Sequence, residues 1–216
     1  MAERKLSPGS ALRLIVVPVG FLQTNCFIVQ SGRQAMIIDP GDDIKDIENH
    51  LAGLKPEFIL LTHSHYDHIG AAGELRKICS CPLYCSAGCS AAIQNPALNF
   101  SYISGRGDIA LAAADRVLKD GEIFMFAGLE IEARATPGHT PDSMSFILDH
   151  AVFTGDLLFH ESVGRTDFPG GNSTHLQNSI YYKIFSLPAN TVIYPGHGTE
   201  TSVAHEKNHN PFISQK

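Results

Sequence analysis

The feature that most constrains the fold is a dense run of metal-binding side chains at residues 62–68, directly after the apolar segment 58–61. The run reads Thr-His-Ser-His-Tyr-Asp-His, and its possible ligands are His63, His65, Asp67 and His68. Imidazole and carboxylate groups together suit zinc, iron or manganese. Packing alone does not explain such a loop, because every polar group buried there needs a hydrogen-bond partner. The run therefore predicts a metal site.

Three further ligand candidates come later in the chain, each where an apolar strand ends and a glycine precedes the ligand. They are His139, Asp156 and His197. Strand ends of this kind normally carry functional side chains in α/β scaffolds. Seven ligands exceed the needs of one four-coordinate ion, but they suit two ions ~3.5 to 4 Å apart that share a carboxylate. We predict that Asp156 is the shared ligand.

The order and spacing of these seven residues resemble the metallo-β-lactamase superfamily, from about Asp39 to His197. The resemblance implies a mixed α/β (α+β) fold, a four-layer α/β/β/α sandwich with the site at the rim between two sheets. It also implies two divalent metal ions, with zinc favoured and iron or manganese as alternatives. The implied ligands are His63, His65 and His139 for the first ion, Asp67, His68 and His197 for the second, and Asp156 for both.

Asp39 has two interpretations that the sequence leaves equal. In the segment Ile38-Asp39-Pro40-Gly41, it resembles the acid that orients a metal ligand in this superfamily. It is also a typical turn-initiating residue before Pro-Gly.

The expected chemistry is hydrolysis of an acyl bond. Two ions lower the pKa of a shared water and polarise a carbonyl, so no side-chain nucleophile is needed, and we predict catalytic roles for Asp67 and Asp156. Residues 162–172 and 206–212 resemble the glyoxalase II-like (hydroxyacylglutathione hydrolase-like) branch. That resemblance implies hydrolysis of the thioester S-2-hydroxyacylglutathione by a metal-bridging hydroxide.

Glutathione recognition is left open by the sequence. Only residues 198–216 follow His197, so we expect the C-terminal helical domain of full-length glyoxalase II enzymes to be missing. Arg165 and His160 are the predicted substrate-binding residues, through local anion contacts. Arg165 and Asp167 are equally able to form a structural pair that holds the loop at 170–171, and this interpretation is slightly favoured.

Several other functions fit parts of the pattern. The main alternative is a persulfide dioxygenase, since this chain also resembles that branch of the superfamily in the order of its ligands. The resemblance then implies one iron, held by His63, His139 and Asp156. A β-lactamase is disfavoured because Asp156 stands where a cysteine or serine is expected. A nuclease is weaker still, because the chain lacks the basic charge that binds a nucleic acid. A non-catalytic scaffold is also disfavoured, because the chain keeps all seven ligands.

Composition sets the remaining expectations. With 216 residues and 44% hydrophobic content, we expect one domain over residues 1–216. A net charge of -6 argues against nucleic-acid partners and favours a small-molecule substrate. No apolar run is long enough to span a membrane, and Pro18 and Gly20 interrupt the run at 12–22. Five cysteines favour reduced thiols and a cytoplasmic location, while the oligomeric state stays open.

Four of the cysteines lie within residues 79–89, and we do not predict a metal site there. Their spacings differ from zinc-ribbon pairs, and residues 82–84 are typical of a buried strand.

Hydrophobic patterns predict a mixed arrangement of strands and helices. The expected strands cover residues 12–17, 26–29, 35–38, 58–62, 123–126, 129–135, 143–148, 151–154 and 191–194. The expected helices cover residues 43–52, 70–78, 86–94 and 174–186, the last with Ser173 as its N-cap. Residues 95–114 are expected to form a long surface loop.

Overall fold

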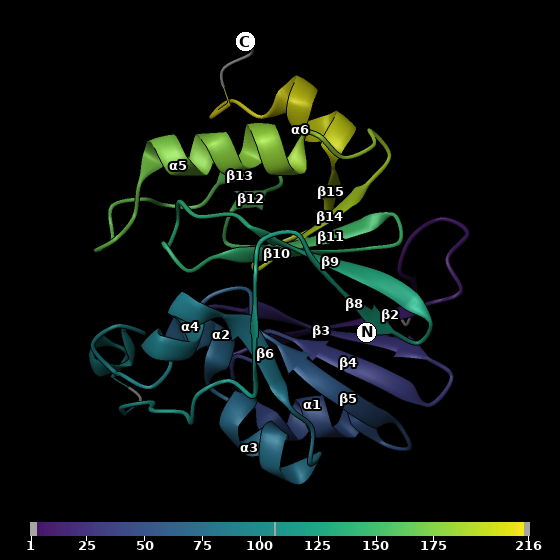
Figure 1. Cartoon of the computed structure of the whole chain (residues 1–216), viewed down its shortest axis with the longest axis vertical. Helices are drawn as coiled ribbons and strands as arrows, with labels where there is room; N and C mark the ends of the chain where they lie inside the picture. The colour runs from purple at the N-terminus through teal and green to yellow at the C-terminus, as the bar shows by residue number, and fades with distance from the viewer. Residues whose placement is uncertain (1–3, 106, 214–216) are drawn as a thin grey trace. The chain divides into compact units, whose positions relative to one another are not determined.

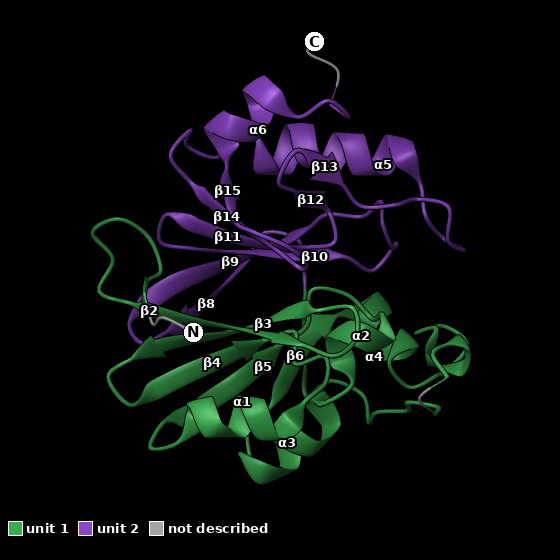
Figure 2. Ribbon diagram, turned by 180° about the vertical axis from the view of Figure 1, so that it is seen from behind, with its two compact units in different colours: residues 1–118 green, residues 119–216 purple. Residues whose placement is uncertain are grey.

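The computed structural model describes residues 4–105 and 107–213, and the chain divides into two compact units. Unit 1 comprises residues 1–118 and unit 2 residues 119–216 (Figure 2). Each unit is built on one large β-sheet with helices against it (Figure 1). The organisation of residues 1–216 as a single domain stays a prediction.

The sheet of unit 1 runs in chain order and changes from antiparallel to parallel pairing at its middle. Its strands are β1 (Arg4–Lys5), β2 (Arg13–Val19), β3 (Thr24–Ser31), β4 (Gln34–Ile38), β5 (Lys55–Leu60), β6 (Leu83–Ser86) and β7 (Arg116–Leu118). Its helices are α1 (Ile44–Leu51), α2 (Tyr66–Ile69), α3 (Ala72–Ile78), α4 (Ala87–Ala92) and the 3-10 turn η1 (Ser101–Ile103). Parallel strands need helical crossovers, and α1 and α3 lie on one face of the sheet (Figure 1).

This topology explains why distant residues meet at one edge of the unit 1 sheet. Strands β4 and β5 are parallel, and Ile38 pairs with Leu60. Their carboxyl ends therefore share an edge, and the backbone N–H of Asp39 donates to the carbonyl of Leu60 at 3.0 Å. The ligand run at 62–68 follows β5 directly, next to Asp39.

The sheet of unit 2 has the order β15-β14-β11-β10-β9-β8. Its strands are β8 (Glu122–Phe126), β9 (Leu129–Ala135), β10 (Met144–Leu148), β11 (Ala151–Gly155), β14 (Val192–Pro195) and β15 (Thr201–Ser202), beside a small hairpin of β12 (Leu158–Phe159) and β13 (Ser162–Val163). Helix α5 (Ser173–Asn178), its π-helical continuation η2 (Ser179–Ile184) and α6 (Val203–His209) lie on one face of this sheet (Figure 1). Strands β9, β11 and β14 run in the same direction, so His139, Asp156 and His197 follow strand ends at one edge.

Each unit has its own apolar core. In unit 1, Ile28, Ile37, Ile59 and Leu83 form a row of paired residues across β3 to β6, and all four are fully buried. Burial of each such side chain contributes about 1.5 to 3 kcal/mol. In unit 2, Val152 and Ile193 of the sheet belong to one buried cluster with residues of α5, η2 and α6. The ligand-bearing strand ends are therefore fixed by packed strands behind them.

Most predicted elements occur within one to three residues of the expected bounds, and β9 covers residues 129–135 as predicted. Two details of the prediction are wrong. The strand expected to reach Thr62 ends at Leu60, because the N–H of Thr62 donates to a carboxylate oxygen of Asp39 instead of a strand. The N-cap of α5 is Asn172 and not Ser173, since the Asn172 side chain accepts the N–H of His175 at 2.9 Å.

No helix in the described parts of the chain, residues 4–105 and 107–213, is long and apolar enough to cross a membrane.

Candidate metal centre

In unit 1, the four predicted ligands of the run 62–68 lie close together. The ring centroids of His63 and His65 are 4.7 Å apart, and those of His63 and His68 are 4.1 Å apart. The Nε2 atom of His68 lies 3.5 Å from Oδ2 of Asp67. Helix α2 begins at Tyr66, so Asp67 and His68 project from one short helical turn, while His63 and His65 precede it.

Asp39 holds this group from behind. It is fully buried, and its two carboxylate oxygens accept the backbone N–H of Thr62 at 2.7 Å and the Thr62 hydroxyl at 2.6 Å. Its Oδ2 atom also lies 2.9 Å from Nδ1 of His68. A carboxylate that binds one imidazole nitrogen fixes the ring and directs the other nitrogen toward a metal. Of the two interpretations of Asp39, these contacts support the orienting acid, although its φ of +51° shows that it also forms a turn.

Two threonines complete the support in unit 1, and the sequence pattern did not indicate either of them. The Thr24 hydroxyl donates to Oδ2 of Asp67 at 3.0 Å. The Thr62 hydroxyl lies 3.1 Å from Nδ1 of His63. Thr62 borders the ligand run, so its role was accessible from the sequence, but Thr24 stands 43 positions from Asp67 and belongs to no recognisable motif.

In unit 2, Asp156 lies between the two predicted imidazole ligands. Its Oδ2 atom is 3.6 Å from Nε2 of His139 and 3.5 Å from Nε2 of His197. These separations are too long for good hydrogen bonds. They suit two ligands of one ion, because zinc bonds of about 2.0 to 2.2 Å place tetrahedral ligand atoms about 3.3 Å apart. Each separation therefore suits a pair of ligands on one ion, so the Asp156 carboxylate is placed to share an ion with either histidine.

Main-chain groups support the ligands of unit 2. The backbone carbonyl of Arg165 lies 2.8 Å from Nδ1 of His139, which leaves Nε2 on the side of Asp156. The segment that carries this carbonyl runs very close to Asp156, since a Cβ atom at Gly164 would lie 1.8 Å from the Asp156 carbonyl oxygen. Only glycine allows this approach.

The side chains of the predicted substrate-binding residues are engaged with neighbours. The Nε and Nη2 atoms of Arg165 each donate to Asp167 at 2.7 Å, and the guanidinium carbon lies 4.0 Å from the Phe168 ring centroid. The hydrogen bond from Arg165 lowers the pKa of Asp167 to about 2. The ring of His160 stacks on that of His205 with centroids 4.9 Å apart. Substrate contacts by Arg165 and His160 stay predictions.

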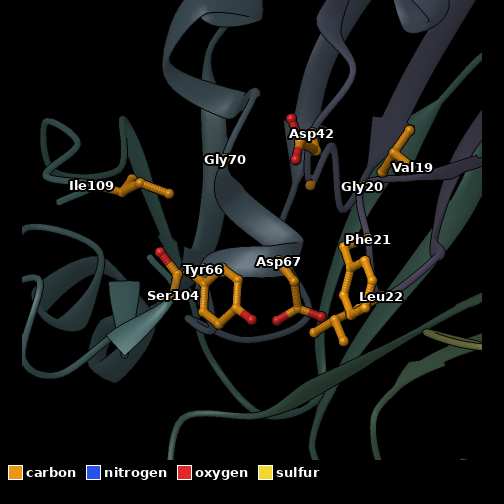
Figure 3. Close-up of a pocket in the computed structure, with 11 residues that line it drawn as sticks. Val19, Gly20, Phe21, Leu22, Asp42, Tyr66, Asp67, Gly70, Ser104 and Ile109 are labelled. Atoms are coloured by element: carbon orange, nitrogen blue, oxygen red, sulfur yellow. The ribbon is translucent and has the colours of Figure 1, made fainter. Parts of the chain in front are cut away.

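A pocket of about 490 Å³ opens in unit 1 beside Asp67 (Figure 3). Tyr66 and Asp67 project into it from α2, and Phe21 and Leu22 of the turn between β2 and β3 flank Asp67. The rest of the wall comes from the end of β2, the turn after β4, Gly70, and Ser104 and Ile109 of the long surface loop. The wall thus combines apolar side chains with hydroxyl and carboxylate groups, and the volume lies in the range of small-molecule sites.

Buried Asn99 ties the long surface loop to this pocket. Its backbone carbonyl accepts the backbone N–H of Tyr66 at 2.9 Å, and its side-chain amide donates to the backbone carbonyl of Ile109 at 2.8 Å. Burial, followed by the charge of Asp67, raises the pKa of the Tyr66 phenol, so its hydroxyl keeps its proton at neutral pH. Tyr66 therefore places a hydrogen-bond donor next to the carboxylate.

The cysteine cluster lies mostly in the core of unit 1. Cys81 and Cys85 are buried at and beside β6, in agreement with the predicted buried strand. Burial, followed by the charge of Cys79, raises the pKa of the Cys81 thiol to about 12. This thiol is protonated at neutral pH, and the expectation that the cluster is no metal site stays a prediction.

The model of the metallo-β-lactamase superfamily matches residues 19–197, which include all seven predicted ligands. The chain belongs to the metallo-β-lactamase superfamily. Among curated relatives, "Probable metallo-hydrolase YqgX" of Bacillus subtilis is 37% identical over 92% of this chain and 96% of its own length. "Hydroxyacylglutathione hydrolase GloC" of Haemophilus influenzae is 33% identical over 95% of this chain and 100% of its own length. The predicted family, with its metal-binding hydrolases, is confirmed.

Solved structures of the superfamily share the fold. The B3 metallo-β-lactamase BLEG-1 is 37% identical with a TM-score of 0.89, covering 93% of this chain and 99% of its own. ETHE1 from Myxococcus xanthus is 31% identical with a TM-score of 0.75, covering 92% and 83%. TTHA1623, solved in a di-iron-bound form, is 33% identical with a TM-score of 0.78, covering 92% and 100%. The predicted mixed α/β metallo-β-lactamase fold, with two sheets flanked by helices, is confirmed.

Proposed function

We propose that this protein is a dinuclear-metal hydrolase of thioesters whose substrate is an S-2-hydroxyacylglutathione. Its proposed ligands are the seven residues predicted from the sequence, with zinc favoured over iron or manganese. The relative GloC, named a hydroxyacylglutathione hydrolase, supports the substrate class because it matches nearly the whole chain. The cytoplasmic location inferred from the cysteines belongs to this proposal.

The observation that carries the proposal is the position of Asp156. One oxygen of this carboxylate lies at nearly equal distances, 3.6 and 3.5 Å, from the Nε2 atoms of His139 and His197. The superfamily pattern assigns these two histidines to different ions. An oxygen placed between them suits a ligand shared by two ions.

When bound, two divalent ions would make a water acidic near neutral pH and would stabilise negative charge on the acyl oxygen. The protein's own residues prepare the site for this chemistry. Asp39 holds the imidazole of His68, and Thr24 holds the carboxylate of Asp67. Tyr66 offers a protonated hydroxyl at the wall of the pocket. These groups keep the ligands oriented before substrate enters.

The pocket beside Asp67 supports a short acyl group as part of the substrate. Phe21, Leu22 and Ile109 offer apolar surface, while Ser104 and Tyr66 offer hydroxyl groups for a substrate hydroxyl. Arg165 would contact a carboxylate of the glutathione part, as predicted from the sequence, with His160 as the second contact.

A persulfide dioxygenase is the second candidate, favoured by the similarity to ETHE1 from Myxococcus xanthus. This function would use one iron, held by His63, His139 and Asp156. It differs from the hydrolase in metal count and in its need for oxygen, so the two functions are separable in one experiment.

The test combines elemental analysis of the purified protein with two assays. We expect two metal ions per chain and hydrolysis of S-lactoylglutathione, without oxygen uptake on glutathione persulfide. One iron per chain with oxygen uptake would overturn the hydrolase in favour of the dioxygenase.

Matched amide variants test the role of Asp156. We expect Asp156→Asn to lose metal and to lower kcat for S-lactoylglutathione by at least about a hundredfold, the scale of losing one electrostatic contact to a transition state. Asp149→Asn, which makes the same change in the turn between β10 and β11, serves as the control and should keep both. Full turnover by Asp156→Asn would contradict the proposal.

A further inference from the structure

A second group of metal-binding side chains lies in unit 2, outside the seven predicted ligands. His160 and Glu161 form the turn of the β12–β13 hairpin, and His205 lies on α6. One ligand atom from each of the three residues lies within 4.8 Å of the others. Nε2 of His205 is 3.0 Å from a carboxylate oxygen of Glu161, and the rings of His160 and His205 stack with an interplanar angle of 17°.

Buried contacts fix the backbone of the hairpin against α6. Glu206 is 1% exposed, and its carboxylate accepts the backbone N–H of Glu161, which lies 3.3 and 3.1 Å from the two oxygens. The side-chain amide of Asn210 donates to the carbonyl of Ser162 at 3.1 Å and to Glu206 at 2.7 Å. The hairpin turn and the helix are therefore positioned together, and only the three ligand side chains remain to adjust.

We propose that His160, Glu161 and His205 bind one divalent transition-metal ion, zinc or another ion that accepts imidazole. Two imidazoles and one carboxylate form a common ligand set for zinc and related ions, and they disfavour magnesium and calcium. Tetrahedral coordination needs ligand atoms about 3.3 Å apart. The ligand atoms all lie within 4.8 Å of one another, and the three side chains are partly or largely exposed, so they are able to rotate to this spacing.

Binding of the ion replaces the contact between His205 and Glu161. The ion takes the Nε2 lone pair of His205 and a carboxylate oxygen of Glu161 as ligands, and so it lies between two groups that now touch directly. A water molecule completes the coordination. The bound ion then joins the β12–β13 hairpin to α6 through side chains, in addition to the existing clamp by Glu206, and it stabilises unit 2.

Copper provides a probe that distinguishes this site from the seven-ligand site. Protein is first loaded with two equivalents of zinc, which the seven-ligand site should take up, and Cu²⁺ is then added while the electron paramagnetic resonance spectrum is recorded. We expect a copper signal with nitrogen hyperfine coupling in the wild type. In His205→Gln, the affinity for this copper should fall by more than about tenfold. Removal of a group that only orients a metal ligand already costs about tenfold, and His205 is a ligand itself. His150→Gln, at an exposed histidine outside the group, is the matched control and should bind copper like the wild type.

Equilibrium dialysis against zinc gives an independent count. We expect wild type and His150→Gln to bind one more zinc ion per chain than His205→Gln and Glu161→Gln, because each of the latter two lacks one ligand. The Glu161→Gln variant keeps its backbone bond to Glu206, so its loss of zinc reports on the carboxylate itself. Equal zinc and copper binding by all four proteins would overturn the proposal. The comparison between variants does not depend on turnover, so loss of the proposed thioesterase function would leave this result intact.

Discussion

The two ligand groups of the molecule are built in different ways. In unit 1, four ligands come from one run of seven residues and are held by buried side chains, above all Asp39. In unit 2, three ligands come from three separate strand ends, and His139 is held by a main-chain carbonyl. The side chain of His68 is fully buried, whereas that of His197 is 26% exposed.

This difference shows what each kind of site demands of the sequence. A contiguous ligand run needs particular side chains behind it, because the loop itself does not fix the imidazole rings. A dispersed group relies on strand packing and close backbone approach. The backbone positions of its supporting residues therefore matter more than the types of their side chains. Side-chain substitutions behind the ligands should therefore be tolerated less well in unit 1 than in unit 2, whereas close backbone approach matters in both.

The largest effects are expected at the glycines where backbone segments touch. A Cβ atom at Gly41 would lie 1.7 Å from the carbonyl oxygen of Asp67, and one at Gly164 would lie 1.8 Å from that of Asp156. We expect Gly41→Ala and Gly164→Ala each to lower the free energy of unfolding by about 3 kcal/mol or more, measured by chemical denaturation, because the main chain must move. Both should also lose metal.

The control for these variants is Gly53→Ala. Gly53 has a positive φ of +79° but open space around it, so the substitution should lower the free energy of unfolding by only about 1 to 2 kcal/mol. If Gly41→Ala or Gly164→Ala were as mild as this control, the close backbone approach would not be what holds that ligand group.

The next effect separates the two groups by chemistry. Asp39→Ala removes the carboxylate that binds His68 and Thr62, and we expect metal affinity to fall by about 10- to 100-fold. Competition with a chelator during zinc titration measures this loss, and excess zinc should restore part of the turnover. Unchanged affinity in a folded Asp39→Ala protein would show that side chains are no more important in unit 1 than in unit 2.

The same difference explains which parts of the candidate site the sequence was able to indicate. All seven ligands stand in recognisable local contexts, and the strands that carry them have clear apolar patterns. Thr24 and Asn99 were missed because their roles depend on which loop they face after folding, and no local pattern marks either residue. The carbonyl of Arg165 was equally hidden, since any residue type offers the same main-chain acceptor. Sequence reasoning recovers chemical types more readily than spatial support.

Thr24 allows a smaller test within unit 1. Its hydroxyl donates to the carboxylate of Asp67, and hydrogen bonds to charged groups contribute about 1.5 to 3 kcal/mol. We therefore expect Thr24→Val, which keeps the shape of the side chain, to weaken metal binding by about tenfold in the same titration. Thr24→Ser keeps the hydroxyl and should bind metal like the wild type, so equal losses in both variants would assign the effect to packing.

The smallest effect on the metal is expected at Arg165. Its carbonyl supports His139, while its exposed side chain pairs with Asp167 and lies over Phe168. Arg165→Ala keeps the carbonyl, so zinc affinity and kcat should stay within about twofold of the wild type. If the guanidinium also contacts a carboxylate of the thiol carrier, KM for S-lactoylglutathione should rise by up to about fivefold, the scale of an exposed ion pair.

Asp167→Ala distinguishes the two roles of that guanidinium. It removes the partner that now accepts two hydrogen bonds from Arg165, and so it leaves the cation available to substrate. A substrate-binding Arg165 predicts an unchanged or lower KM in Asp167→Ala and a higher KM in Arg165→Ala. A purely structural pair predicts the same change in both variants, because either substitution breaks the same contact. A loss of zinc in Arg165→Ala would contradict the view that unit 2 holds its ligands through the main chain.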